Sequence, residues 1–359
     1  PDEYEHWLTG AILNAHDTLP SGERLVFINA WNEWAEGAHL EPDTRNGHGY
    51  LDATRHALAQ FADTAHGYMR IRVMIRQYLA NLAYGVWRKG HALGKWELRG
   101  IVEGLAARGK GGPRFHIAVI LPLDKIEFVL ATLESLENQL YTDGWGISLI
   151  ADIPEPAGLE SLSMLRWVER GERSPLQAVN DELVSSGVDW VGMLEAGDAL
   201  PVHAMFALST AILKHPEWGM VYPDEDLLDR HGNRSDAYFK PDFSIDLVRG
   251  APFSIGGGAF YRRELFEHLG GFDLDMEGIE YWEIALRMHE RLGDNGIGHL
   301  PDILYHRFDG GGHCPRSADE LDTARQRGLA GHLTRVGLSA DIGEGMLPGT
   351  FHIRYRHTD

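Results

Sequence analysis

The sequence predicts an α/β protein whose largest part, residues 113–359, folds around a mostly parallel sheet. In this segment short apolar strands alternate with amphipathic helices, which is the pattern of βαβ units. Acidic residues directly follow several of the strands, and open α/β sheets bind ligands at the carboxyl ends of their strands. Charge is also uneven along the chain, with net values of −7 over residues 1–60, +6 over 61–112 and −19 over 113–359. These shifts indicate three segments.

Composition excludes several classes of protein. The chain has 359 residues, of which 43% are hydrophobic and 24% charged, as in ordinary globular proteins. A single cysteine, Cys314, excludes a disulfide framework and a cysteine-based zinc site, and it fits a reducing compartment. No signal peptide is evident, and no apolar run reaches the roughly 18 residues of a transmembrane helix. The net charge of −20 argues against a nucleic-acid partner. We therefore expect a cytoplasmic protein.

The elements expected in the C-terminal segment follow the chain in order. Strands are predicted over residues 115–123, 146–152, 188–194 and 219–229, with helices over 127–140 and 174–187 between them. Asp152 stands at the end of the second strand, and the third runs into an acidic turn at 195–198. If the strands are parallel, these acids meet at one edge of the sheet.

The basic middle segment, residues 63–112, predicts a helix and then a linker. Apolar residues recur at helical spacing between residues 68 and 89, and "ARGKGGPR" at 107–114 is typical of a linker. The apolar stripe and its arginines could rest on an anionic membrane surface. Alternatively, the stripe packs against the rest of the protein, and we favour this because most amphipathic helices face a core.

The N-terminal segment carries a different cluster. An apolar strand at 25–28 runs into "NAWNEWAEG", which holds two tryptophans, with Glu33 between them and Glu36 two residues after the second. Paired carboxylates are the usual groups for cleaving a glycosidic bond. Tryptophan faces can stack on sugar rings. Such a turn is typical of the carboxyl end of a barrel strand.

Residues 115 to about 309 resemble glycosyltransferase family 2. The resemblance rests on motifs in the family's order, among them "TLESLENQ", "MLEAGDALPVHAM", "YPDEDLLDRHGNRSDAYFKPDFSIDLV", "GGGAFYRRELFEHLGGFD" and "LPDILYHRFD". It implies a GT-A fold and inverting transfer of a sugar from a nucleotide-sugar donor. The "YPDED…YFKPDFSIDL" stretch resembles the branch found in surface-polysaccharide assembly. The resemblance thus implies a glycan or lipid-linked acceptor and a role in surface-polysaccharide (O-antigen) biosynthesis. We expect the protein in the cytoplasm, where it could be peripheral to the inner face of the plasma membrane.

The resemblance also assigns a metal site. Asp198 matches the family's metal-binding aspartate and Glu195 matches the first acid of that motif, whereas Gly197 replaces another acid. A divalent cation, Mn²⁺ or Mg²⁺, would neutralise the departing diphosphate. An acidic turn that caps a helix is the structural alternative.

Other positions are assigned by the same resemblance. Asp152 matches an acid that contacts the nucleotide, Asp224 and Asp226 match acids that contact donor or acceptor, and His306 matches a histidine near the diphosphate. For each a structural role is the alternative: Asp224 and Asp226 could cap a turn, and His306 could be a hydrogen-bonded core histidine.

The position of the general base departs from the family. The position where the family has an acid is occupied here by Tyr281. A phenol with a pKa near 10 is a poor base at neutral pH. Glu280, one residue earlier, is the candidate base. Two functions therefore stay open, an active transferase and a degenerate module that binds nucleotide or glycan.

The N-terminal cluster resembles the end of glycoside hydrolase family 99-like (WbsX-like) proteins, in which Glu33 and Glu36 match catalytic carboxylates. The match covers about 60 residues, whereas a (β/α)₈ barrel needs roughly 250. We therefore expect an inert barrel remnant over residues 1–62, a basic helical linker over 63–112 and the transferase-like domain over 113–359.

Overall fold

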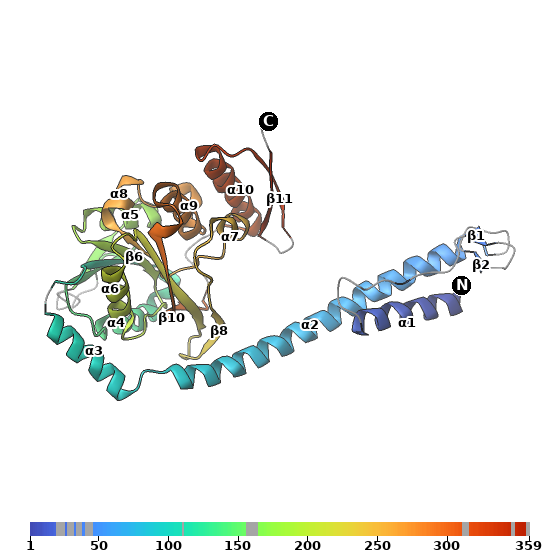
Figure 1. Cartoon of the computed structure of the whole chain (residues 1–359), viewed down its shortest axis with the longest axis horizontal. Coiled ribbons are helices and arrows are strands. Elements are labelled where there is room, and N and C mark those ends of the chain that lie inside the picture. The colour runs from blue at the N-terminus through green and yellow to red at the C-terminus, as the bar shows by residue number, and fades with distance from the viewer. Residues whose placement is uncertain are drawn as a thin grey trace. The chain divides into compact units, whose positions relative to one another are not determined.

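The structure is a computed structural model that describes residues 1–18, 26, 32–33, 38–39, 46–109, 111–155, 164–310, 316–345 and 349–356. The chain divides into two compact units, residues 1–83 and 84–359, and the boundary falls inside one long helix, α2 (Gly49–His91) (Figure 1). The sequence placed boundaries at 62/63 and 112/113 instead. The end of α2 and all of α3 (Lys95–Arg108) are thus part of the larger unit.

In the smaller unit, helix α1 (Asp2–Thr18) packs against the first turns of α2. Leu8 and Ala57 are buried there, and the hydroxyls of Tyr4 and Thr54 lie 3.0 Å apart. Two short strands, β1 (Asn32–Glu33) and β2 (Ala38–His39), pair antiparallel. Of the strand predicted over residues 25–28, only Val26 is described, and it lies in no strand.

The larger unit is built on an eight-stranded sheet with strand order β10-β7-β9-β6-β3-β4-β5, in which β8 pairs with β7. Neighbours are parallel except around β9 and β8. Its strands are β3 (Phe115–Leu121), β4 (Trp145–Ala151), β5 (Leu165–Glu169), β6 (Trp190–Glu195), β7 (Met220–Leu228), β8 (Arg234–Tyr238), β9 (Phe260–Arg262) and β10 (Ile297–Phe308). The predicted α/β fold with a mostly parallel sheet is confirmed.

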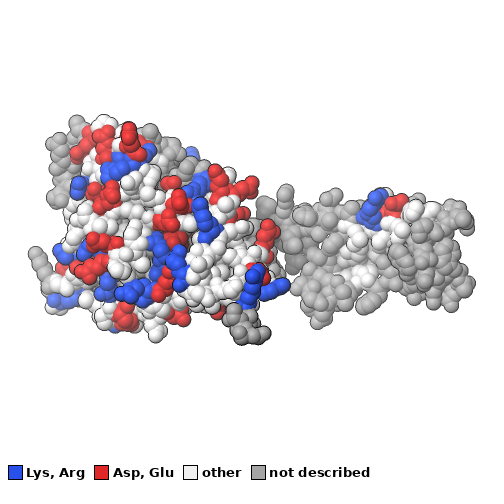
Figure 2. Space-filling view, turned by 90° about the horizontal axis from the view of Figure 1, so that it is seen from above, with Lys and Arg blue, Asp and Glu red and all other residues white. Residues whose placement is uncertain are grey.

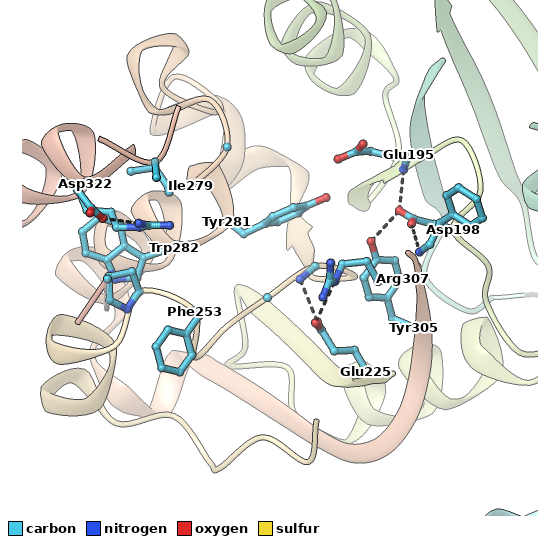
Figure 3. Close-up of a pocket in the computed structure, with 18 residues that line it drawn as sticks. Glu195, Asp198, Glu225, Phe253, Ile279, Tyr281, Trp282, Tyr305, Arg307 and Asp322 are labelled. Carbon is cyan, nitrogen blue, oxygen red and sulfur yellow. Dashed lines mark hydrogen bonds and ion pairs between the residues drawn. The ribbon is translucent and has the colours of Figure 1, made fainter. Parts of the chain in front are cut away.

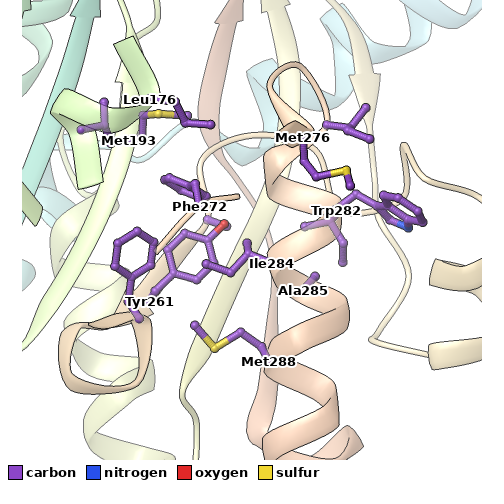
Figure 4. Close-up of a cluster of buried hydrophobic side chains, with 14 of the residues drawn as sticks. Leu176, Met193, Tyr261, Phe272, Met276, Trp282, Ile284, Ala285 and Met288 are labelled. Atoms are coloured by element: carbon purple, nitrogen blue, oxygen red, sulfur yellow. The ribbon is translucent and has the colours of Figure 1, made fainter. Parts of the chain in front are cut away.

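Helices cover both faces of this sheet (Figure 1). One face carries α4 (Val129–Glu137) and α6 (Ala204–Lys214), and the other carries α5 (Pro175–Ser185), α8 (Arg263–His268) and α9 (Glu280–Leu292). Strand β3 shows why: Ile117 and Val119 enter one core while Ala118 and Ile120 enter the other. A strand buried on both faces is apolar throughout, as its sequence predicts. Figure 4 shows the core that holds Ala118 and Ile120, in which Met193 lies beside Leu176 of α5 and Phe272 lies toward Ile284 of α9.

The rest of the larger unit follows the sheet or connects its strands. Helix α7 (Ile245–Gly250) leads to β9, and α10 (Ala318–Arg335) precedes an antiparallel pair, β11 (Ala340–Glu344) with β12 (Phe351–Tyr355). Short 3₁₀ segments span Leu123–Phe128, Leu274–Met276 and Asp294–Gly296. The helix predicted over 127–140 thus begins as a 3₁₀ turn. Among the described residues, no helix combines the length and apolarity that crossing a bilayer requires.

Candidate functional site

The acidic turn predicted at the end of β6 lies at the carboxyl edge of the sheet, from Glu195 to Asp198. Gly197 has φ +105°, and a Cβ atom there would approach the ring of Phe308 to 2.5 Å. Glycine is therefore the residue that fits both the backbone and the space. This explains why the extra acid that the resemblance leads one to expect is missing at this position.

Asp198 is buried and fixed by three hydrogen bonds. Its Oδ2 accepts from the backbone N–H of Glu195 at 2.8 Å and from the hydroxyl of Tyr305 at 2.6 Å. Its Oδ1 accepts from the backbone N–H of Phe308 at 2.9 Å. Two of these donors lie on β10, so the end of β10 positions the carboxylate of the β6 turn.

The surroundings of this turn raise the pKa of its buried acid. Burial, together with the charge of Glu195, raises the pKa of Asp198 to about 6, although its hydrogen bonds act in the opposite direction. Burial raises the pKa of the Tyr305 and Tyr281 hydroxyls well above 10, so both remain protonated donors. A cation placed beside Asp198 and Glu195 would favour their ionised forms.

The turn opens into a cavity of about 460 Å³ within the larger unit (Figure 3). Glu195, Asp198 and Tyr305 lie at one end, and Phe253, Trp282 and Asp322 lie at the other, with Tyr281 and Arg307 between them. The remaining lining residues are Glu225, Pro252, Gly256, Gly257, Gly278, Ile279, Phe308, Ala318, Arg325 and Gly349. The cavity therefore offers acids, arginines and aromatic rings, the side chains that commonly bind phosphates and sugars.

Strand β7 contributes Glu225 to this cavity rather than its two neighbours. Side chains alternate along a strand, so Glu225 points into the cavity while Asp224 and Asp226 point to the other side. Glu225 pairs with the buried Lys240 at 2.9 Å and lies 3.6 Å from Arg307. Its Oε2 accepts from the backbone N–H of Gly257 at 3.1 Å.

Glycine allows this close approach. A Cβ atom at Gly256, which has φ +64°, would lie 2.3 Å from Oε2 of Glu225. The "GGG" of the sequence thus makes room for a cavity carboxylate and its buried cation. Burial lowers the pKa of Lys240, and the charge of Glu225 opposes that effect.

Asp224 and Asp226 have protein partners instead of cavity exposure. Asp224 accepts from the backbone N–H of Lys240 at 2.7 Å and contacts Nε2 of His299 at 2.9 Å. Asp226 is contacted by Tyr84, Arg234 and His306. Burial disfavours the charged form of Asp226, but these bonds and charges outweigh it and lower its pKa.

Two further predicted positions lie outside the cavity lining. Asp152 follows β4 directly and is paired with Arg170. Nδ1 of His306 lies 2.6 Å from Oδ1 of Asp226, and burial lowers the pKa of this imidazole. His306 is thus the hydrogen-bonded buried histidine of the structural alternative in this structure, while its neighbours Tyr305 and Arg307 face the cavity.

The predicted base lies at the first residue of α9. Glu280 is buried and accepts from the backbone N–H of Gly278 at 2.5 Å. Gly278, Ile279 and Tyr281 line the cavity, whereas Glu280 does not. The Tyr281 hydroxyl donates to the carbonyl oxygen of Met193 at 3.2 Å.

The residues beside the turn are compatible with a divalent cation held jointly with a substrate. The described part of the chain contains no group of three or more metal-ligating side chains. Mg²⁺ is usually held by one or two carboxylates plus substrate phosphates, however, and Glu195 and Asp198 supply two at one end of the cavity. Oδ1 of Asp198 accepts a single protein hydrogen bond and so retains acceptor capacity.

The predicted carboxylates of the N-terminal segment are not built into a described site. Glu36 lies outside the described residues, and of Glu33 the structure describes only its backbone in β1. Their predicted inertness stays a prediction.

The end of α2 packs within the larger unit through residues outside the predicted stripe. Tyr84 is buried and Trp87 packs on Phe239 at 5.0 Å. The described members of the stripe are exposed, with Tyr78 at 70% and Val86 at 69%, and side chains before residue 77 in the stripe lie outside the described part. On the face seen in Figure 2, acidic and basic side chains are interspersed over the described surface of the larger unit.

Comparison with known proteins adds a family match at the N-terminus. Residues 1–54 match the family described as "Glycosyltransferase WbsX". The N-terminal segment resembles WbsX proteins. This confirms the resemblance inferred from "NEWAEG", and the family description names a transferase rather than a hydrolase.

Curated relatives cover more of the chain. An O-antigen biosynthesis protein RfbC of Myxococcus xanthus is 32% identical over 242 residues, which are 64% of this chain and 18% of that protein. An uncharacterised protein y4gI of Sinorhizobium fredii is 26% identical over 283 residues, 75% of this chain and 31% of that protein. WxcX of Xanthomonas campestris, also uncharacterised, is 54% identical over 65 residues. The chain spans less than a third of the length of each of these relatives.

Solved structures give a looser likeness. TarS residues 1–349 from S. aureus in complex with UDP-GlcNAc has a TM-score of 0.47 at 14% identity, covering 61% of this chain and 66% of that one. The mannosyltransferase PcManGT from Pyrobaculum calidifontis, in complex with GDP-Man and Mn²⁺, has a TM-score of 0.43 at 17% identity, covering 74% of each chain. At these scores the likeness carries no argument about the site.

Proposed function

We propose that this chain is a glycosyltransferase of surface-polysaccharide assembly, which transfers a sugar from a nucleotide-sugar donor to a glycan or lipid-linked acceptor. Support comes from the 32% identity to an O-antigen biosynthesis protein over 242 residues, most of which must fall in the larger unit. The family 2 motifs of the sequence support a GT-A enzyme that inverts the anomeric centre. The acceptor and the site of action at the inner face of the plasma membrane are part of the same proposal.

The observation that carries the proposal is the cavity at the ends of β6 and β7. Glu195, Asp198, Glu225 and Arg307 all line this cavity. Its volume of about 460 Å³ suits a sugar and a diphosphate better than a macromolecule. The aromatic rings at the far end suit the apolar faces of a sugar. We assign the Glu195–Asp198 end to the donor diphosphate and the Phe253–Trp282 end to the acceptor.

The two acids at the donor end would hold Mn²⁺ or Mg²⁺. When bound, the cation would neutralise charge on the departing nucleoside diphosphate. The chain's own part is to fix Asp198 through Tyr305 and the β10 backbone. Arg307, at the middle of the cavity, can contact phosphate oxygens directly.

Glu280 is the proposed general base. It lies between Ile279 and Tyr281, both of which line the cavity, so a shift at the start of α9 is needed to bring its carboxylate to an acceptor hydroxyl. Asp152, Asp224, Asp226 and His306 have protein partners outside the lining, so we propose that any effect they have on substrate binding is indirect.

A second candidate, a module that binds nucleotide or glycan without turnover, is favoured by one observation. The position that should carry the base holds Tyr281, whose pKa is raised by burial and whose hydroxyl is bonded to Met193. Both functions need the same cavity, and turnover separates them.

The deciding experiment measures nucleotide release from UDP-, GDP- and dTDP-sugars by the chain and by Glu280→Gln. The proposal expects release with at least one donor, and a kcat at least 100-fold lower in Glu280→Gln with unchanged donor affinity. Glu264→Gln, on an exposed side chain of α8, is the control and should turn over normally. Donor binding without release by the wild-type chain favours the binding module. Equal turnover of Glu280→Gln would remove Glu280 as the base.

A further inference from the structure

One buried carboxylate joins three separate elements of the larger unit. Asp226 of β7, with 1% of its surface exposed, accepts a 2.5 Å hydrogen bond from the Tyr84 hydroxyl at the end of α2. It also accepts a 2.6 Å bond from Nε of Arg234 on β8 and lies 2.6 Å from Nδ1 of His306 on β10. Nη2 of Arg234 in turn donates to the Tyr84 hydroxyl at 2.9 Å. We call these four side chains the Asp226 cluster.

The ring of Tyr84 is held by packing that does not depend on its hydroxyl. Trp87 stacks on it at 5.9 Å, and Phe239, just after β8, meets its edge at 6.5 Å. Trp87 and Phe239 also contact each other at 5.0 Å. The last turns of α2 are therefore packed on the β7–β8 hairpin, and removal of the Tyr84 hydroxyl alone leaves this packing in place.

The Asp226 cluster lies directly behind the cavity wall. Glu225 directly precedes Asp226 in the chain, and Tyr305 and Arg307 flank His306. These three neighbouring residues, Glu225, Tyr305 and Arg307, line the cavity. The backbone of His306 exchanges two hydrogen bonds of 2.9 Å with Ala199, the residue after Asp198. A shift of His306 would thus be transmitted to Ala199 by backbone bonds and to Tyr305 and Arg307 by chain connectivity.

The hydroxyl of Tyr84 matters to this arrangement because the acceptor is a buried anion. Three side-chain donors stabilise the Asp226 carboxylate, and the loss of one leaves a buried charge less well solvated by the protein. His306 and Arg234 would then have to move to compensate. Of these two, His306 is the one connected to the acidic turn.

We propose that Tyr84 is a positioning residue of the site: its hydroxyl, through Asp226 and His306, fixes the β10 backbone that holds Asp198 and presents Arg307. The end of α2 within the larger unit is thereby coupled to the cavity. The effect of Tyr84 on catalysis rests on the proposed function, whereas the coupling of its hydroxyl to the β10 backbone does not.

Tyr84→Phe in the full chain tests the coupling, with Tyr78→Phe as the matched control because Tyr78 is an exposed tyrosine of the same helix. Hydrogen exchange followed by mass spectrometry is the first readout. We expect exchange at least threefold faster in the peptides that contain Ala199 and residues 305–308 in Tyr84→Phe, and no change in Tyr78→Phe. A role limited to helix docking would change exchange only in residues 84–91 and 234–239, and that result would overturn the inference.

The second readout is nucleotide affinity and donor turnover. We expect roughly tenfold weaker nucleotide binding and a lower kcat in Tyr84→Phe. Wild-type affinity and kcat in a variant with altered exchange would overturn the catalytic part of the inference. If the wild-type chain binds no nucleotide, the proposed function fails, and the exchange readout still decides the coupling. If Tyr84→Phe does not fold, Arg234→Lys, which weakens the same cluster from a partly exposed side chain, replaces it and should accelerate exchange in the same two peptides.

Discussion

The hydroxyl of Tyr305 donates a 2.6 Å hydrogen bond to Oδ2 of Asp198, so that strand β10 holds the acid of the β6 turn. Both residues line the cavity, and both are buried. The acid is therefore fixed before any ligand arrives, and the acidic end of the cavity is preorganised.

Replacement of Tyr305 by phenylalanine should weaken this end of the cavity. We expect Tyr305→Phe to lose about 1–3 kcal/mol of unfolding free energy, because a buried acid loses a donor, and to bind nucleotide at least fivefold more weakly. Tyr222→Phe is the control, since the Tyr222 hydroxyl donates to Pro241 outside the cavity. Chemical denaturation and calorimetry measure both quantities. Equal nucleotide affinity in the two variants would contradict the role of Tyr305.

The buried pair of Glu225 and Lys240 gives a second prediction. Glu225→Gln should lose about 3–5 kcal/mol of stability, because Lys240, only 5% exposed, is left without its carboxylate. The double variant Glu225→Gln/Lys240→Met should regain most of that stability, because it buries no unpaired charge.

Donor turnover should not return with stability in the double variant, since the cavity still lacks Glu225. Thermal unfolding and nucleotide release measure the two effects separately. If the stabilised double variant turns over donor at the wild-type rate, Glu225 is structural only.

We predict that stability depends on pH through His299, which contacts Asp224. Burial lowers the pKa of His299, but hydrogen bonds and charges of Asp224 and Asp242 outweigh it and leave the pKa raised above 6.5. Because the folded state holds this proton more tightly than the unfolded state, the stabilisation is fully present below pH 6.5 and is lost as pH rises through the folded-state pKa.

The variant His299→Gln removes the pH-dependent contribution of His299 to the free energy of unfolding. The difference in unfolding free energy between the wild type and His299→Gln should be larger at pH 5.5 than at pH 8.5, measured by denaturant unfolding. A difference that is constant or that grows with pH would show that the imidazolium does not stabilise the fold.

The exposed stripe of α2 supports a proposal of membrane contact. Tyr78, Leu79, Leu82 and Val86 are exposed, whereas Tyr84 and Trp87 pack within the larger unit, and Arg88 and Lys89 follow directly. We expect the chain to float with vesicles containing phosphatidylglycerol at low salt and to detach at high salt.

Leu82→Gln/Val86→Gln should abolish this flotation without loss of stability, because both side chains are exposed. Vesicles of phosphatidylcholine alone are the lipid control. Absence of wild-type flotation at low salt would remove the membrane proposal.

Much of the fold could be predicted from the sequence because its strands are apolar and regularly spaced. Strand β3 and the turn at Glu195–Asp198 were predicted in place, since a strand buried on both faces and a following acid are local features. The end of α2 was missed as a part of the larger unit. Its place there is set by contacts between distant parts of the chain, among them the Tyr84–Asp226 bond, which joins residues 142 positions apart.

The site was predicted less well, for a physical reason. Asp224 and Asp226 were predicted to contact substrate, and Glu225 between them was not. Side chains alternate along a strand, so the middle residue of the three faces the opposite side from the other two. Which face meets the cavity depends on the neighbouring strands. Tyr305 and Arg307 flank His306 and follow the same rule, so these two neighbours line the cavity whereas His306 does not, and its role stays a prediction.

We propose above all that the acidic end of the cavity binds a nucleoside diphosphate together with a divalent cation. Titration calorimetry of the full chain with UDP, GDP and dTDP, each with Mn²⁺ and again with excess chelator, tests it most directly. We predict that at least one nucleotide binds with Mn²⁺ and that chelator weakens its affinity at least tenfold. In Asp198→Asn the affinity with Mn²⁺ should fall to the level seen with chelator. Failure of all three nucleotides to bind, or binding that is indifferent to chelator, would contradict the account.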